Sequence, residues 1–297
     1  MSSETSWLQL TLDAVRHSPE KLEEALLQAG ALAVTLQDAG EQPVLEPAPG
    51  ETPLWPHTRV TGLFAAETDM DQINQLLQTL LGDSETTYAA ELDMLAERDW
   101  TRAWLDDFRP LRFGNILWVC PHEQTPPDPS ATIVYLDPGL AFGTGSHPTT
   151  ALCLTWLDSI KLRGKTAIDY GCGSGILAIA AAKLGANQVW AVDIDPQALL
   201  ACESNARAND VAALITASEP AQLPLQPCDV LLANILAGPL IELAPRFSDL
   251  VKPQGQLALA GLLCEQAAAV QAAFEPWFRF EPCQQQEDWV LLTGIRR

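Results

Sequence analysis

A glycine-rich turn between a strand-like and a helix-like segment is the feature that most constrains the fold of this chain. The run Thr166–Ile168 is apolar, the segment Asp169–Gly175 places glycine at every second position from 171 to 175, and residues 176–184 have a helical pattern. Glycine lacks Cβ, so the backbone can turn sharply there and a ligand can lie against it, beside the N–H groups of the helix start. This strand-turn-helix predicts a nucleotide-type pocket.

The next strand-like run supplies an acidic residue for the same pocket. The apolar run Gln188–Val192 ends at Asp193, eighteen residues after Gly175. A carboxylate at this place can accept hydrogen bonds from both hydroxyls of a ribose. The pocket is therefore predicted to bind an adenosine.

Two adenosine ligands remain open on these residues. Gly173, Gly175 and Ala178 satisfy the loose glycine fingerprint of NAD-binding folds, and Asp193 would serve NAD equally well. Asp169, however, directly precedes the turn, where its charge opposes a diphosphate. The same charge suits S-adenosylmethionine, which carries an α-ammonium and a sulfonium and no phosphate. We therefore favour S-adenosylmethionine over NAD.

The segments after residue 165 alternate between strand-like and helix-like patterns, which predicts a doubly wound α/β fold with a parallel sheet. Two strand-like runs at 278–282 and 289–293 have no helix between them. They predict an antiparallel end of the sheet, as in the seven-stranded sheet of methyltransferases.

The first third of the chain predicts a small domain of its own. Strand-like and helix-like runs follow in the order β-α-β-β-α-β, from Trp7–Leu12 to Tyr88–Asp93, which is a ferredoxin-like α+β pattern. Trp100, Trp104 and Phe108 then recur at fourfold spacing, as on one stripe of a helix. This helix is either a hinge that presents a substrate or an apolar face docked on its neighbours. We expect domains at 1–93 and 109–297 with a helical linker at 94–108.

Composition excludes several classes of protein. No run reaches the roughly 18 apolar residues of a membrane span, and the amino terminus lacks the regions of a signal peptide. We expect a cytoplasmic protein without membrane contact. The seven cysteines form no C-x-x-C pair and the four histidines are dispersed, which predicts reduced thiols and no metal.

The charge is strongly negative and uneven. The chain has 38 acidic and 17 basic residues, a net charge of −21, and residues 1–107 hold 20 of the acids and 5 of the bases. Such a surface repels phosphate backbones, so a nucleic-acid substrate is not expected. Solubility alone is the simpler explanation for most of the individual carboxylates.

A further strand, Asp229–Asn234, places Asn234 at the carboxyl edge of the sheet, where open α/β sheets bind ligands. Its side chain offers both donors and an acceptor. The same residue would also serve as a turn or cap before the following helix.

Three motifs together resemble one known family. The segments Ala141–Thr150, Asp169–Leu177 and Asn234–Ala237 resemble the methyltransferases of ribosomal protein L-eleven, the stalk-base protein of the large subunit, and the resemblance covers almost the whole chain. It implies a class I methyltransferase domain that uses S-adenosylmethionine. The implied catalytic residue is Asn234. The implied cofactor contacts are Phe142, Gly143, Thr150, Asp169, Gly171, Gly173, Gly175, Asp193 and Asn234.

The resemblance also implies a reaction and a partner. Members trimethylate the amino-terminal α-amine and lysines of that basic protein, which the ferredoxin-like domain grips, and we expect a monomer. Asp169 would support the glycine turn or face the ammonium of the cofactor. The alternatives are an NAD-dependent oxidoreductase, a non-catalytic binding protein, and a nucleic-acid amine methyltransferase. The last class commonly has Pro-Pro and an aromatic residue after its Asn or Asp, whereas Asn234 precedes Ile235 and Leu236.

Overall fold

The computed structural model describes residues 6–40, 53–82, 93–96, 109–122, 124, 128, 131–136, 145–224 and 226–297. The chain divides into two compact units, residues 1–101 and 102–297. Among the described residues, no helix is both long enough and apolar enough to cross a membrane.

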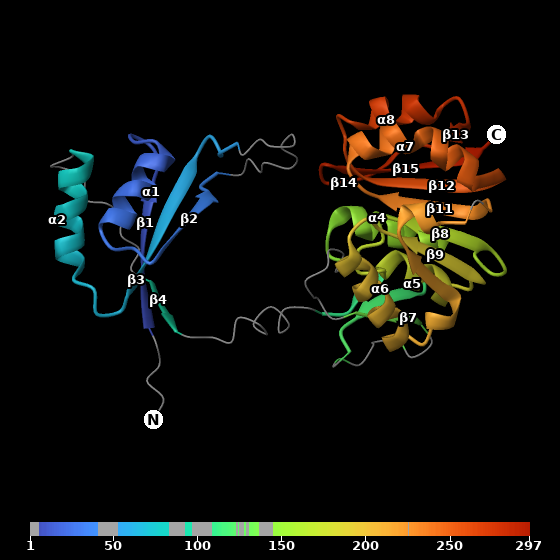
Figure 1. Cartoon of the computed structure of the whole chain (residues 1–297), viewed down its shortest axis with the longest axis horizontal. Coiled ribbons are helices and arrows are strands. Elements are labelled where there is room, and N and C mark those ends of the chain that lie inside the picture. The colour runs from blue at the N-terminus through green and yellow to red at the C-terminus, as the bar shows by residue number, and fades with distance from the viewer. Residues whose placement is uncertain are drawn as a thin grey trace. The chain divides into compact units, whose positions relative to one another are not determined.

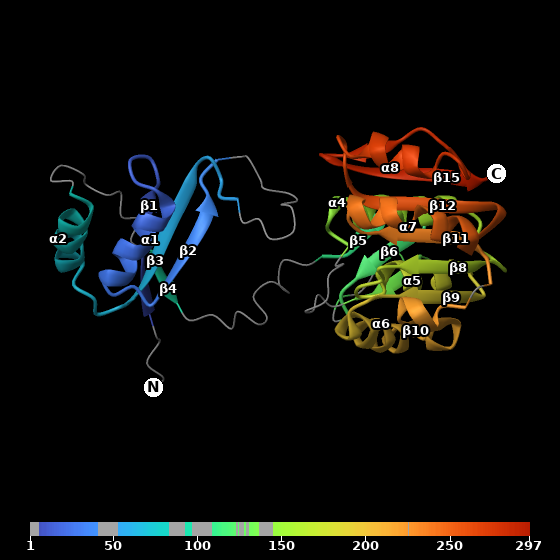
Figure 2. The same cartoon turned by 45° about the horizontal axis from the view of Figure 1, so that its top comes forward.

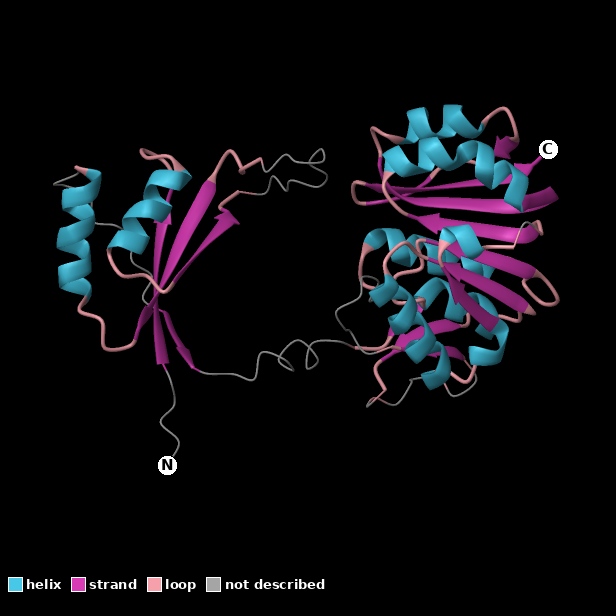
Figure 3. Ribbon diagram, in the orientation of Figure 1, coloured by secondary structure: helices cyan, strands magenta, loops and turns pink. Residues whose placement is uncertain are grey.

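The first unit is a four-stranded antiparallel sheet with two helices (Figures 1 and 3). Its elements are β1 (Ser6–Asp13), α1 (Pro19–Gln28), β2 (Ala33–Asp38), β3 (Thr58–Ala65), α2 (Met70–Leu81) and β4 (Asp93–Ala96). The sheet order is β2-β3-β1-β4, with each neighbour antiparallel. The element order is the β-α-β-β-α-β order that the sequence predicts.

Local signals set the ends of both helices. Ser18 caps α1, its hydroxyl accepting from the N–H of Lys21 at 3.4 Å, and Pro19 occupies the first turn, where its missing N–H is harmless. Asp69 caps α2 by accepting from two backbone N–H groups, and Gly82 ends it in the left-handed conformation at φ 76°. These residues set the ends of α2 at Met70 and Leu81.

The fourth strand differs from its prediction. It spans Asp93–Ala96, whereas the sequence predicts a strand at Tyr88–Asp93, of which all but the last residue lie outside the described part of the chain. The predicted helical linker covers 94–108, yet its first three residues are strand residues, because Met94, Leu95 and Ala96 pair with Leu8, Trp7 and Ser6 of β1. The tryptophan stripe of the predicted linker lies outside the described residues.

The second unit is an α/β domain. Its described strands are β5 (Leu111–Phe113), β6 (Leu117–Cys120), β7 (Thr132–Tyr135), β8 (Thr166–Tyr170), β9 (Gln188–Val192), β10 (Ile215–Ser218), β11 (Cys228–Asn234), β12 (Val251–Leu263), β13 (Phe278–Phe280), β14 (Gln284–Gln286) and β15 (Trp289–Arg296). Its helices are α4 (Pro148–Ser159), α5 (Ile176–Lys183), α6 (Pro196–Ala208), α7 (Ala237–Leu250) and α8 (Ala267–Phe274), with short 3-10 helices at Ala212–Leu214 and Pro220–Gln222.

The main sheet has the order β10-β9-β8-β11-β12-β15-β13, and β14 pairs with β15 off this path. The neighbours from β10 to β12 are parallel, while β15 runs antiparallel to β12, β13 and β14. The predicted doubly wound sheet with an antiparallel end is confirmed. A separate three-stranded sheet, β5-β6-β7, precedes α4 in the chain.

Helices cover both faces of the main sheet, as Figure 2 shows. Side chains that alternate along the strands divide the core between the two faces. Leu232 packs in the hydrophobic cluster that contains α4, α5 and α6. Its neighbours Leu231 and Ala233 pack in the cluster that contains α7 and α8. Successive side chains of a strand point to opposite faces, so a near-continuous apolar run is what a parallel sheet covered on both sides requires. The core lies directly beneath the carboxyl edge, where β8, β9 and β11 end.

Candidate functional site

The glycine turn follows β8 and leads into α5. Gly171, Gly173 and Gly175 have φ of 80°, 52° and 80°, which side chains with a Cβ rarely adopt. The N–H groups of Gly171 and Cys172 donate to the carbonyl of Val192, at the end of β9, at 2.7 and 3.0 Å. The turn is therefore tied to the neighbouring strand.

Two of these glycines also permit close packing. A Cβ on Gly171 would collide with Cγ2 of Ile235, which follows β11, and a Cβ on Gly175 would lie 2.5 Å from Sγ of Cys202 on α6. Gly175 is also the N-cap of α5, and no side chain caps that helix end. The turn is thus a backbone cradle at a helix N-terminus, an arrangement that accepts polar ligand atoms.

Asp193 and the turn are in direct contact. Its Oδ2 accepts from the N–H of Gly173 at 2.9 Å, and its Oδ1 accepts from the N–H of Asp195 at 3.0 Å. Each carboxylate oxygen has a further lone pair. The carboxylate can therefore hold the glycine turn and accept hydrogen bonds from ligand hydroxyls at once.

Asp169 lies beneath the turn, with no exposed surface. Its Oδ2 accepts from the N–H of Ala178 in the first turn of α5 at 2.9 Å, while Oδ1 has no hydrogen-bond partner among the described residues. Burial raises the pKa of Asp169 to about 7, partly offset by the Ala178 bond and reinforced by the charge of Asp193. The bond to α5 corresponds to the predicted role in supporting the turn.

Thr150 and Asn234 meet across the site. Nδ2 of Asn234, at the end of β11, donates to Oγ1 of Thr150 in the first turn of α4 at 3.4 Å. Thr150 is buried and Asn234 is half-buried. Residues 84 positions apart, each predicted from its own motif, thus lie together at the carboxyl edge of the sheet.

The structure describes seven of the predicted site residues. All seven belong to the carboxyl edge of the main sheet or to the glycine turn after β8. Phe142 and Gly143 lie outside the described residues. All seven cysteines of the chain are free thiols, and within the described ranges no group of three His, Cys, Asp or Glu side chains is arranged so that it could hold a metal ion.

The sequence did not assign a role to the contact between His147 and Trp289. His147 caps α4, Nδ1 accepting from the N–H of Thr149 at 3.3 Å, and its ring meets that of Trp289 edge-on at 4.8 Å between centroids. Burial lowers the pKa of His147, and the charge of Glu287 opposes that shift. The contact ties the motif segment Ala141–Thr150, to which His147 belongs, to the first residue of β15. The only sequence signal was the His-Pro pair at the start of a helix.

This sheet order and three features of the site together define a class I methyltransferase. The features are the glycine turn after the first central strand, the acidic residue at the end of the next strand and the asparagine at the end of β11. Comparison with known proteins supports a narrower assignment. The model of the family described as Ribosomal protein L11 methyltransferase (PrmA) matches residues 6–297. The chain belongs to this family of methyltransferases.

Individual relatives cover almost the whole chain. It is similar to the ribosomal protein L11 methyltransferase of Actinobacillus pleuropneumoniae serotype 5b, with 49% identity over 98% of this chain and 100% of the relative. The Sodalis glossinidius protein of the same name is 51% identical over 98% and 99% of the two chains. A crystal structure of ribosomal protein L11 methylase from Lactobacillus delbrueckii subsp. bulgaricus matches with 32% identity and a TM-score of 0.59, over 64% of this chain and 100% of that one.

Proposed function

We propose that this methyltransferase transfers methyl groups from S-adenosylmethionine to amines of ribosomal protein L11 (L-eleven), the amino-terminal α-amine and lysine side chains, up to the trimethylated state. The observation that carries the cofactor is the hydrogen bond between Asp193 and Gly173, which joins a ribose-binding carboxylate to a glycine cradle. The substrate class follows from the family, whose named relatives match the chain from end to end.

The residues of the cradle fit such a cofactor. Asp193 would accept from the ribose hydroxyls, and the glycines would let the ligand lie against the backbone. Oδ1 of Asp169 is a buried carboxylate oxygen without a partner among the described residues, so a cation above the turn would stabilise its ionised form. S-adenosylmethionine supplies cationic charge and the methyl group to be transferred.

Asn234 would orient the acceptor amine. Its Nδ2 donates to Thr150, so Oδ1 is the atom that can accept an N–H of the amine. That hydrogen bond would aim the nitrogen lone pair at the methyl group. Transfer from a sulfonium is an in-line displacement, so alignment and exclusion of water contribute more than activation of a leaving group.

The amine must lose its proton before it can react. At pH 7 this costs about 4 to 5 kcal/mol for a lysine of ordinary pKa and about 1 to 1.5 kcal/mol for an α-amine. Burial of the lysine in the site lowers its pKa and supplies part of the cost. The mechanism therefore uses positioning and desolvation and needs no dedicated general base.

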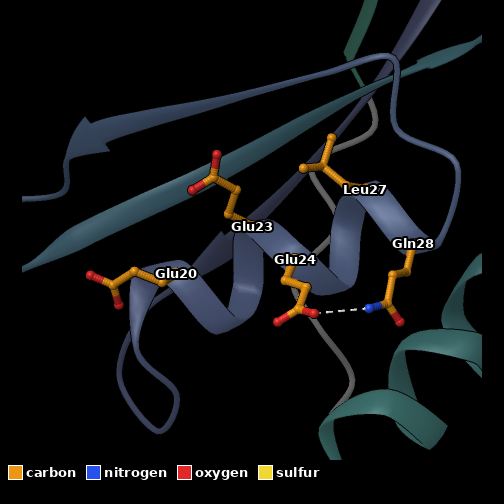
Figure 4. A pocket seen from close by; sticks show the side chains of 5 residues that line it. All are labelled: Glu20, Glu23, Glu24, Leu27 and Gln28. Atoms are coloured by element: carbon orange, nitrogen blue, oxygen red, sulfur yellow. Dashed lines mark hydrogen bonds between the residues drawn. The ribbon is translucent and has the colours of Figure 1, made fainter.

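The first unit would bind the protein substrate, which is basic. Figure 4 shows Glu20, Glu23, Glu24, Leu27 and Gln28 along one side of α1, around a hollow. These side chains lie on the side away from the buried Leu22 and Leu26, so three carboxylates and an exposed leucine face solvent together.

Leucine next to carboxylates suits a basic protein surface with an apolar contact at its centre. A ribosomal substrate also favours action in the cytoplasm by a monomer, with no direct binding of nucleic acid.

The test is mass spectrometry of recombinant ribosomal protein L11 before and after incubation with the full chain and S-adenosylmethionine. We expect mass increases in 14 Da steps, the mass of a CH₂, located by peptide mapping to the amino terminus and to lysines. Incubation with NAD in place of S-adenosylmethionine is the control for the alternative cofactor. Unchanged protein in the presence of bound cofactor would refute the substrate, and absence of cofactor binding would refute the reaction.

A further inference from the structure

Ile235, the residue after Asn234, lies between Gly171 of the glycine turn and Gly261 of β12. On one side its Cγ2 occupies the space that a Cβ of Gly171 would need. On the other side, a Cβ on Gly261 would lie 2.5 Å from its carbonyl oxygen, 2.9 Å from its carbonyl carbon and 3.0 Å from its nitrogen. We name Gly171 and Gly261 the glycine notch.

The two sides of the notch differ in how their neighbouring atoms could move to accommodate a Cβ. The side chain of Ile235 can rotate away from Gly171, but the atoms that face Gly261 belong to the backbone. Gly261 is buried, with φ of 80°, where the pairing of β12 with β15 shifts register between Leu259 and Leu262. An isolated glycine in a strand commonly marks a bulge or a close approach of another backbone, and here it marks both.

Gly261 faces the backbone of Ile235 on both sides of its Cα, and the Ile235 nitrogen is bonded to the carbonyl carbon of Asn234. Asn234 pairs with Ala260 in the β11–β12 ladder, one residue before Ile235 and Gly261 meet. Displacement of the Ile235 peptide would therefore rotate or shift Asn234 and its contact with Thr150.

We infer that Gly261 is a positioning residue, which sets the place of the Asn234 side chain by letting the Ile235 peptide seat against β12. The inference rests on the proposed role of Asn234 in orienting the acceptor amine. Displacement of a reacting group by about 1 Å can cost about 100-fold in rate, so a single methyl group at position 261 should act on the reaction.

The chain supplies a matched control for this test. Gly164 has φ of 81°, almost the same as Gly261, and a Cβ there would meet no atom within 4 Å. Gly164→Ala and Gly261→Ala therefore carry similar backbone strain in the left-handed region. Only Gly261→Ala adds the collision with Ile235.

The experiment is a double-mutant cycle on kcat with the full chain, S-adenosylmethionine and ribosomal protein L11. The variants are Gly164→Ala, Gly261→Ala, Asn234→Ala and the combination of the last two. We expect Gly164→Ala to keep the wild-type kcat and Gly261→Ala to lower it by ten- to a hundredfold, about the scale of a misplaced group. In the Asn234→Ala background, Gly261→Ala should have no further effect on kcat, because the group that it displaces is gone.

Each outcome separates the inference from the proposed function. Wild-type kcat for Asn234→Ala refutes the role of Asn234, while a slow Asn234→Ala with a fast Gly261→Ala refutes only the role of Gly261. An equal loss from Gly261→Ala in both backgrounds shows a general structural effect and also refutes it. If Gly261→Ala does not fold at the assay temperature, the four proteins are compared at a lower temperature at which it does. The loss of kcat should again appear with Asn234 present and vanish without it.

Discussion

The carboxylate of Asp193 accepts a hydrogen bond from the backbone N–H of Gly173 at 2.9 Å, which links the ends of β9 and β8 across 20 residues of sequence. The bond fixes the middle of the glycine turn relative to the strand that carries the proposed ribose-binding group. Ribose and methionine moieties of one ligand would therefore meet a single rigid surface. Loss of the Asp193 carboxylate should therefore affect the binding of both the ribose and the methionine moiety.

Asp193→Ala should weaken binding of S-adenosylmethionine by about 1.5 to 3 kcal/mol, the scale for hydrogen bonds to a charged group. Isothermal titration calorimetry measures this difference. Asp195→Ala is the neighbouring control, since Asp195 caps α6 through the N–H of Gln197 and is exposed. That variant should change affinity little. Unchanged affinity for Asp193→Ala, or binding of NAD by the wild type, would contradict the assignment.

Asp169→Asn should change how stability depends on pH. The pKa of Asp169 is about 7 in the folded protein and about 3.9 for an unfolded aspartate. Between these values the folded state holds a proton that the unfolded state has lost. The contribution of Asp169 to wild-type stability should therefore fall as pH rises from about 4 to about 7, by roughly 1 kcal/mol per pH unit. Asparagine does not ionise, and its carbonyl can still accept from Ala178.

Urea unfolding of the wild type and Asp169→Asn at several pH values tests this expectation. The variant should gain stability relative to the wild type between pH 4 and pH 7, and the difference should level off above that range. Groups other than Asp169 titrate in both proteins and cancel in the comparison. Parallel curves across the window would show that Asp169 keeps an ordinary pKa.

The two kinds of acceptor amine should respond differently to pH. Between pH 7 and 9 a lysine with a pKa of about 10.4 gains neutral fraction throughout, whereas an α-amine with a pKa near 8 approaches saturation. Lysine methylation should therefore rise more steeply than α-amine methylation. Site-resolved mass spectrometry of initial rates measures both at once. Parallel profiles would mean that the enzyme equalises the two amines or that chemistry does not limit the rate.

Charge on α1 should speed substrate capture. The triple change Glu20→Gln, Glu23→Gln and Glu24→Gln should lower the rate at subsaturating ribosomal protein L11 and weaken its dependence on salt, because long-range attraction is screened over about 10 Å at 0.1 M. Cofactor affinity should stay constant. The matched control neutralises the exposed Glu242, Asp249 and Glu275 of the second unit, removing the same charge elsewhere. Equal losses in both triple variants would assign the effect to net charge alone.

Removal of the first unit is a stronger form of the same prediction. A chain that begins near residue 105 should bind S-adenosylmethionine and lose methylation of folded ribosomal protein L11. Calorimetry with the cofactor checks that the shortened chain is folded. If it methylates the protein as efficiently as the full chain, the first unit is not the recognition module.

Much of the cofactor half of the site could be predicted because its signals are local. The glycines, Asp169 and the start of α5 lie within ten residues, and the bond from Ala178 to Asp169 spans only nine. Helix limits were predictable for the same reason, since Asp69 and Gly82 act within one turn of the α2 ends. Strand β12 spans Val251–Leu263, although Pro253 and Gly255 disfavour a strand locally. The ladders pass over these two residues, because β11 pairs with Val251 and with 256–260, and β15 pairs from Gln256 onward.

The sequence by itself determined the strand-turn-helix of the cradle, the acidic end of β9 and the alternation that builds a parallel sheet, because each depends on neighbours along the chain. Only the tertiary structure decided which distant residues share the site. His147 meets Trp289, Thr150 meets Asn234, and Gly261 receives the Ile235 peptide. These contacts form because β11, β12 and β15 lie side by side with their ends at one edge of the sheet. Such contacts depend on strand order and register, which no local pattern of residues specifies.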